Sequence, residues 1–286
     1  MKNSNAFLSR RSLIISACAG LSLLALGGLT ACGGSGAAGS ADDSVITVAA
    51  SPAPHAQILT DFAAPRLAEQ GIELKVKEYT DYIQPNKDTA SGAVDANYFQ
   101  HITYLENSNA ENGTDLVSAG LIHYEPFAVY AGTSNDLDAI ADGATIAIPN
   151  DATNEARALY LLAEQGLIEI DPEAGLKATP NDITSNPKNL KFTELEAAMI
   201  PNTLDEFDLN VINSNFALQA DLNPAEDALV SEDAESESAQ TYANVIAVKE
   251  GHEKDPAVVA LVEALHSEEI VQFLNDTYSG SVLTIK

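Results

Sequence analysis

Residues 149–157, PNDATNEAR, contain the arginine best suited to bind an anion. An apolar strand is expected over 145–148 and a helix over about 154–165, so this polar turn joins a strand end to a helix start. Free backbone N–H groups and the positive end of the helix dipole lie at such a turn. Arg157 stands in the first helical turn, where a cation opposes the dipole by roughly 0.3–1 kcal/mol. Its planar guanidinium matches a carboxylate, either that of a ligand or that of an acidic side chain of this chain.

Two segments that mix aromatic and polar residues, DYIQPN at 81–86 and DANYFQH at 95–101, follow predicted strands. The clefts of α/β proteins open at such strand ends. Tyr82, Phe99 and His101 can therefore wall an apolar slot. A thioether suits such a slot, because sulfur gains roughly 0.3–1.5 kcal/mol from each ring edge it contacts. The alternative is that these rings only pack between layers of the fold.

A third polar segment, VINSNFA at 211–217, places Asn213 and Asn215 between a strand and a short helix. A side-chain amide can donate to a carboxylate and accept from an ammonium group. Helix capping is the alternative, and it explains one asparagine more easily than two. Tyr242 and Asn244 lie where the chain is expected to return to its first lobe, a place where hinge and ligand contacts concentrate.

Sequence patterns of catalysis and metal binding are lacking. The chain has no G-x-S-x-G, H-E-x-x-H, P-loop or G-x-G-x-x-G pattern, and its histidines lack the spacing of metal ligands. We therefore predict no enzyme, no metal and no cofactor. An exported enzyme that uses His101 or Glu125 as a general base is the alternative from a different class. The histidines are His55, His101, His123, His252 and His266.

The charge balance argues against nucleic-acid binding. The 286 residues include 42 acidic and 14 basic ones, a formal charge of −28, which repels phosphate backbones. The start of the chain is typical of an export signal, with positive residues before an apolar run at 13–29. LTAC at 29–32 resembles the lipobox of bacterial lipoproteins, so residues 1–31 are predicted to be removed and Cys32 lipidated. Either general secretory or twin-arginine export fits. Residues 32–44 are predicted to be a flexible tether.

Strands alternate with helices of 10–15 residues along the remaining chain, which is typical of α/β folds with parallel sheets. We expect a two-lobed, periplasmic-binding-protein-like fold, type II-like, with two hinge crossovers. Lobe 1 comprises 45–129 and 243–286, and lobe 2 comprises 130–242. The acidic stretch 226–237 is expected to be a solvated loop. Strands are expected at 45–49, 72–76, near 94, and at 116–121, 127–130, 145–148, 209–212 and 242–248, and helices at 55–70, 99–107, 154–165, 193–199, from 215, and at 256–266 and 268–278.

These segments together resemble one family, the methionine-binding lipoproteins of the MetQ/NlpA family. The resemblance covers nearly all of the chain after Cys32. It implies a lipid-anchored protein on the extracytoplasmic face of the cell membrane, which delivers methionine to the permease and ATPase of an ABC importer. The segments that carry it are APHA at 53–56, DYIQPN, DANYFQH, IPND at 148–151 with Asn154 and Arg157, VINSNFA, and YANV at 242–245.

The same resemblance implies roles for individual residues. Arg157 would hold the ligand carboxylate, and Glu125 would attract the ammonium group. The other carried-over residues are Asn154, Asn213 and Asn215 at the polar end of the ligand, and Tyr82, Phe99 and His101 around its thioether chain. L-methionine is the expected ligand. D-methionine, another small amino acid or a dipeptide remains an alternative, as does an adhesin that keeps the fold without the ligand.

Overall fold

The computed structural model describes residues 44–233 and 238–285. They belong to one compact unit, Ala41–Lys286. The predicted signal peptide, the lipidation site Cys32 and most of the predicted tether lie outside the described residues. Each helix of the described part is too short or too polar to span a bilayer.

The first sheet has six strands, in the order β13-β4-β12-β3-β1-β2. β1 pairs in parallel with β2 and β3, while β12 runs antiparallel to both β3 and β4. The sheet is therefore mixed, where the sequence predicted parallel pairing. The reason is the return of the chain at Asn244, which lies opposite His123 near the end of β4, so that β12 must run the other way. The strands are β1 (Val45–Ala50), β2 (Glu73–Glu78), β3 (Ala96–His101), β4 (Leu116–Tyr124), β12 (Asn244–Lys249) and β13 (Leu283–Thr284).

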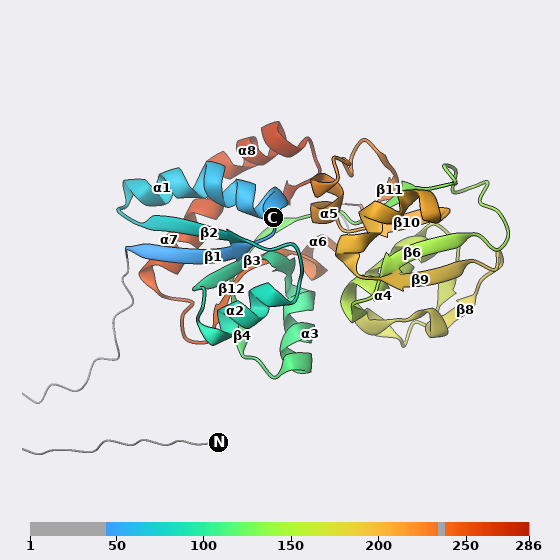
Figure 1. The fold of residues 1–286 in the computed structure, drawn as a ribbon, viewed down its shortest axis with the longest axis horizontal. Helices are drawn as coiled ribbons and strands as arrows, with labels where there is room; N and C mark the ends of the chain where they lie inside the picture. The colour runs from blue at the N-terminus through green and yellow to red at the C-terminus, as the bar shows by residue number, and fades with distance from the viewer. Residues whose placement is uncertain (1–43, 234–237, 286) are drawn as a thin grey trace, which may run out of the picture. The chain divides into compact units, whose positions relative to one another are not determined.

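Helices cover both faces of this sheet (Figure 1). Ile46 and Val48, two apart on β1, share one core with apolar residues of the helices that precede β2 and of α7 and α8. Leu105 of α3 packs on the other face against Val245 and Ala247 of β12. The helices are two π-helical segments (Pro52–Ala56 and Ile58–Ala63), α1 (Ala64–Glu69), α2 (Gln84–Ser91), α3 (Ile102–Asn112), α7 (Pro256–Leu265) and α8 (Glu268–Tyr278).

The second sheet has five strands, in the order β11-β5-β10-β6-β9. Ile146 and Ile148 of β6 pack with α4, and Ala147 between them packs on the opposite face. The strands are β5 (Ala128–Ala131), β6 (Thr145–Pro149), β9 (Lys191–Leu195), β10 (Leu209–Ile212) and β11 (Ala228–Ser231), beside a small pair, β7 (Glu169–Ile170) and β8 (Ile183–Ser185). The helices are α4 (Ala152–Glu164), α5 (Ser214–Gln219), α6 (Ser238–Thr241) and 3-10 segments at Gly175–Lys177, Pro180–Asp182 and Ala197–Glu206.

Three local predictions are wrong. The helix expected at 193–199 is strand β9, which pairs in parallel with β6 and is followed by the 3-10 segment. The helix expected from 99 begins at Ile102, because Phe99 to His101 pair as the end of β3. The acidic stretch 226–237, expected to be a solvated loop, includes strand β11 and the buried Glu232. In each case, pairing with a distant part of the chain decides the structure.

The chain passes between the two sheets twice, from β4 to β5 and from β11 to β12. These passages agree in kind with two hinge crossovers. The predicted lobe limits, 45–129 with 243–286 and 130–242, stay a prediction, since residues 41–286 form one compact unit.

Candidate ligand-binding site

A small cavity is lined by residues from the strand ends of both sheets and from the segments that follow them. Gln100, Tyr104, Ser214 and Asn244 contribute to the lining. The structure also brings to this cavity every residue that the sequence singled out for ligand binding, although their roles toward a ligand stay predictions. Those residues are Tyr82, Phe99, His101, Glu125, Asn154, Arg157, Asn213 and Asn215.

Aromatic rings form one wall of the cavity around Tyr82. The centroid of its ring lies 5.7 Å from that of Phe99, 5.6 Å from that of Tyr104 and 4.9 Å from that of Phe216. Phe216 packs against Tyr82 outside the cavity lining, whereas Tyr104 lines the cavity and was missed by the sequence predictions. Tyr104 is the third residue of α3, and His101 is the N-cap residue of that helix, so the capping position brings the two residues close together.

His101 adds a polar group to this wall. It caps α3, and its Nδ1 accepts a hydrogen bond from the backbone N–H of Tyr104 at 3.0 Å. The ring proton of the neutral imidazole is therefore on Nε2, which faces Oδ1 of Asn154 at 3.3 Å. Burial, followed by the nearby Arg157 cation, lowers the pKa of His101 to about 3. His101 is thus a neutral donor at neutral pH.

Arg157 is buried and ion-paired. Its Nε and Nη2 donate to the two carboxylate oxygens of Glu232 at 2.8 and 2.5 Å, and Nη2 also donates to the carbonyl oxygen of Glu125 at 2.9 Å. The guanidinium carbon lies 4.2 Å from the ring centroid of Tyr242. Burial alone would lower the pKa of Arg157, but the Glu232 carboxylate more than reverses this and the pKa is raised. The bidentate fork thus binds a carboxylate of the chain, while the guanidinium still lines the cavity.

Glu232 is the buried charged residue that the sequence predictions missed most clearly. Besides the Arg157 fork, it accepts hydrogen bonds from the hydroxyl of Tyr124 and from the backbone N–H of Phe127. These four donors hold a carboxylate that is only 7% exposed. Its sequence signal is weak: the apolar pair Leu229 and Val230 interrupts the acidic stretch just before it.

The first turn of α4 is capped by the side chain of Asp151, the N-cap residue. Oδ1 of Asp151 accepts from the backbone N–H of Asn154 at 3.0 Å and from its Nδ2 at 2.9 Å. The backbone N–H of Glu155 donates to the carbonyl oxygen of Asp151. The prediction of N–H groups free for an anion is therefore wrong for Asn154 and Glu155. Asn154 instead serves as a fixed acceptor, since its Oδ1 accepts from Nδ2 of Asn213 at 2.8 Å.

Two buried amide atoms in the cavity lining have no hydrogen-bond partner within the described residues. They are Oδ1 of Asn213, an acceptor, and Nδ2 of Asn215, a donor. The remaining oxygen of Asn215 accepts from the hydroxyl of Tyr82 at 2.5 Å, which fixes the amide so that the donor stays unpaired. An unpaired buried polar group costs about 1–3 kcal/mol. The cavity therefore offers one donor and one acceptor that a ligand can satisfy.

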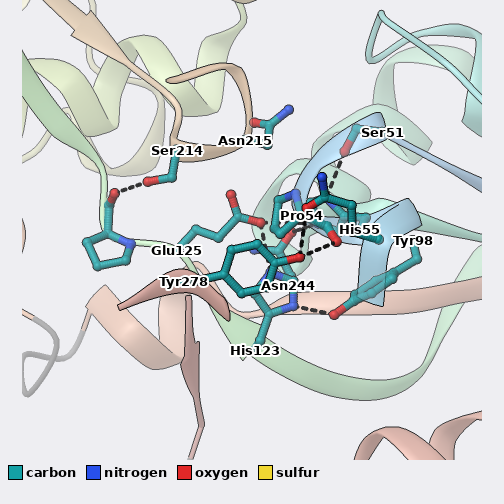
Figure 2. Close-up of polar contacts among 12 residues, drawn as sticks. Ser51, Pro54, His55, Tyr98, His123, Glu125, Ser214, Asn215, Asn244 and Tyr278 are labelled. Atoms are coloured by element: carbon teal, nitrogen blue, oxygen red, sulfur yellow. Dashed lines mark hydrogen bonds and ion pairs between the residues drawn. The ribbon is translucent and has the colours of Figure 1, made fainter. Parts of the chain in front are cut away.

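Glu125 lies against His123, two residues before it, and against His55, which is distant in sequence (Figure 2). Its Oε1 is 2.8 Å from Nε2 of His123 and 3.2 Å from Nε2 of His55. Burial lowers the pKa of His55 to about 4 and that of His123 to about 3, and it raises the pKa of Glu125. The three groups are close enough to hold a metal ion, with ligand atoms within 4.8 Å of one another. The sequence spacing of the histidines gave no sign of this cluster.

Comparison with known proteins relates this chain to one family, both by a family model and by sequence identity to a relative. The NlpA lipoprotein family model matches residues 46–285. The methionine-binding lipoprotein MetQ of Bacillus subtilis is 42% identical over 270 residues, which cover 93% of this chain and 96% of that protein.

Two solved structures have the same fold. An ABC transporter periplasmic substrate-binding protein from Coxiella burnetii superposes with a TM-score of 0.79 at 37% identity, covering 84% of this chain and 100% of that one. A nutrient-binding protein from Burkholderia cenocepacia, solved with bound methionine, has a TM-score of 0.79 at 39% identity, with coverages of 84% and 100%. The predicted periplasmic-binding-protein-like α/β fold is confirmed.

Proposed function

Because this chain belongs to the NlpA lipoprotein family, we propose that it is the substrate-binding lipoprotein of an ABC importer and that its ligand is methionine. It binds and releases the amino acid without chemical change. Lipidation at Cys32 anchors it to the extracytoplasmic face of the membrane, and it delivers its ligand to a permease driven by an ATPase. The names of its relatives support the ligand, and the composition of the cavity supports it independently.

The pair of unpaired amide atoms carries this proposal. A free amino acid is a zwitterion, so burying it requires acceptors for the ammonium group and donors for the carboxylate. Asn213 supplies the unpaired acceptor and Asn215 the unpaired donor. Arg157 adds a positive charge for the carboxylate, and Glu125 a carboxylate for the ammonium group. Each polar end of the ligand thus has one amide and one charged side chain.

The aromatic wall accounts for the side chain of the ligand. Tyr82, Phe99 and Tyr104 present ring edges and faces around one part of the cavity. Thioether sulfur is polarizable and gains about 0.3–1.5 kcal/mol from such a contact. A hydrocarbon side chain of the same length gains only its burial, so methionine is favoured over an aliphatic amino acid.

Calorimetric titration of the full chain, purified in detergent and dialysed free of ligand, tests this function. We expect L-methionine to bind with a micromolar or lower Kd and to outcompete D-methionine, leucine and glutamate. Equal affinity for leucine and glutamate, or no binding of any amino acid, would refute it.

Two variants connect the affinity to the site. Arg157→Met should weaken methionine binding by about 100-fold, since it removes a buried charge partner. Arg66→Met is the matched control, because Arg66 lies over the ring of Phe62 and donates to the Phe62 carbonyl oxygen, away from the cavity lining. Asn215→Asp, nearly unchanged in size, puts an acceptor where the proposal needs a donor. It should also weaken binding, and it serves if Arg157→Met does not fold.

A further inference from the structure

The two histidines at Glu125 have a defined proton arrangement. Nε2 of His123 lies 2.8 Å from Oε1 of Glu125, and with Glu125 ionised this nitrogen carries the ring proton and donates to the carboxylate. Its Nδ1 is then an acceptor, and the hydroxyl of Tyr98 donates to it. The residues of this cluster are drawn in Figure 2.

His55 repeats this arrangement. Its Nε2 faces Oε1 of Glu125 and Oδ1 of Asn244, at 3.2 and 3.0 Å, and must therefore carry the proton. Nδ1 accepts from the hydroxyl of Ser51 at 2.7 Å. Both imidazoles are neutral, and each is 1% exposed or less. Two hydroxyl groups thus fix the tautomers of two rings. His123 donates to Oε1 of Glu125, and His55 donates to Oδ1 of Asn244 while its Nε2 lies 3.2 Å from the same Glu125 oxygen.

We propose that the Ser51–His55 and Tyr98–His123 pairs are positioning groups that hold Glu125 for the α-ammonium group of the ligand, so that the cavity selects amino acids over carboxylic acids without an amino group. This inference rests on the proposed function and names the part of the ligand that these groups select. Neither histidine lines the cavity, whereas Glu125 and Asn244 do. The histidines therefore act through Glu125 and do not themselves touch the ligand.

The charges around the cavity explain why Glu125 suits an ammonium group. The carboxylate of Glu232 pairs with the guanidinium of Arg157, and Glu125 is left with only neutral N–H donors at its Oε1. A buried carboxylate without a cation is costly, and the ammonium group of a ligand supplies that cation. A ligand with a carboxylate but no ammonium group would instead bring a second negative charge near Glu125.

A metal ion is the other occupant that this geometry admits. It would need the lone pair of each Nε2, while the contacts of those atoms require them to donate protons to Glu125 and Asn244. All four imidazole nitrogens have partners within the described residues. The contacts therefore favour the hydrogen-bonded carboxylate over a metal site.

The test compares L-methionine with 4-(methylthio)butanoate, which has the same chain and carboxylate but no amino group. Calorimetry on the full chain should show methionine bound at least about 100-fold more tightly. In His123→Phe, which keeps the ring shape without the N–H group, methionine affinity should fall by about tenfold while that of the analogue stays the same. His123→Gln, which restores an N–H donor, should recover most of the loss. His252→Phe is the control, because His252 is exposed and outside the cavity lining.

Other outcomes overturn the inference in distinguishable ways. Equal losses for both ligands in His123→Phe would mean a merely structural role. No loss of affinity for either ligand would mean that the histidines do not position Glu125. Stoichiometric Zn²⁺ binding to the unaltered chain that His123→Phe abolishes would replace the inference by a metal site. If methionine does not bind to the unaltered chain, the proposed function fails first. Should His123→Phe not fold, Tyr98→Phe removes only the hydroxyl that fixes the tautomer and should reduce the ratio in the same direction.

Discussion

Replacing Glu232 by glutamine should destabilise this protein far more than any exposed Glu→Gln change. Glu232 accepts hydrogen bonds from Nε and Nη2 of Arg157, from the hydroxyl of Tyr124 and from the backbone N–H of Phe127. Glutamine has nearly the same shape but no charge, and its NH₂ group cannot accept. The change therefore leaves a buried guanidinium without its anion and at least one donor without an acceptor.

The size of the effect follows from the burial of the pair. The side chains of Arg157 and Glu232 are 4% and 5% exposed, so solvent screens little of the loss. Removing one partner of such a pair costs about 3–5 kcal/mol. Natural domains are stable by about 5–15 kcal/mol, so the variant should still fold. At roughly 2–4 °C per kcal/mol for a protein of this size, the melting temperature should fall by roughly 6–20 °C.

Thermal unfolding followed by circular dichroism measures this change. Glu263→Gln is the matched control, since Glu263 is exposed on α7, and it should shift stability by no more than about 0.5 kcal/mol. The double variant Arg157→Met/Glu232→Gln removes both charges, so it should lose less than the sum of the single losses, by about 2 kcal/mol. If Glu232→Gln melts together with Glu263→Gln, or if the two single losses simply add, the ion pair is not what holds this region.

Two further predictions concern packing and pH. Gly132→Ala should lower the denaturation midpoint by an amount equivalent to about 3 kcal/mol, because its Cβ would collide with the backbone oxygens of Phe207 and Leu204. Gly120→Ala should cost less, because its Cβ meets only side-chain atoms, of Val262 and His266. Equal losses in the two variants would contradict this. Burial, and then the charge of Glu194, raise the pKa of Glu155 to about 7, above its ordinary value of 4.5, so its ionisation should remove stability as the pH rises through this range. Glu155→Gln should therefore melt higher than the unaltered chain at pH 8 and at the same temperature at pH 4, whereas parallel pH profiles would show that Glu155 does not titrate there.

The sequence allowed the cavity residues to be predicted because most of them follow strand ends. Phe99 and His101 end β3, Asn213 follows β10, and Asn154 follows β6. The carboxyl ends of parallel strands lie along one edge of a sheet, which brings together the residues that follow β6 and β10. The cavity between the strand ends of the two sheets then places them beside the residues that end β3. The aromatic residues, Asn213 and Asn215 were therefore recognisable from local patterns together with this topological rule. Asn154 and Glu125 were predicted only through the family resemblance.

Buried ionic contacts were not predictable in this way. The chain has 42 acidic residues, and nothing local distinguishes Glu232 from its exposed neighbours. The cluster at Glu125 depends on the insertion of β12 between β3 and β4, which places Asn244 opposite both His101 and His123. That register belongs to the assembled sheet. The positions of His55, His123 and Glu125 along the sequence therefore do not reveal this strand register.

The pairing of Arg157 with Glu232 also explains how a cavity can be ready for a carboxylate while it is empty. A buried guanidinium without an anion would destabilise the unliganded protein, whereas Glu232 neutralises it and fixes its plane. A zwitterionic ligand then enters without changing the net charge of the cavity, since its ammonium group and carboxylate cancel. Glutamate would add a negative charge beside Glu125 and Glu232, and lysine would add a cation among rings that give it no carboxylate. We therefore expect the buried charges themselves to select a neutral amino acid, so that the aromatic wall needs to distinguish only among neutral side chains.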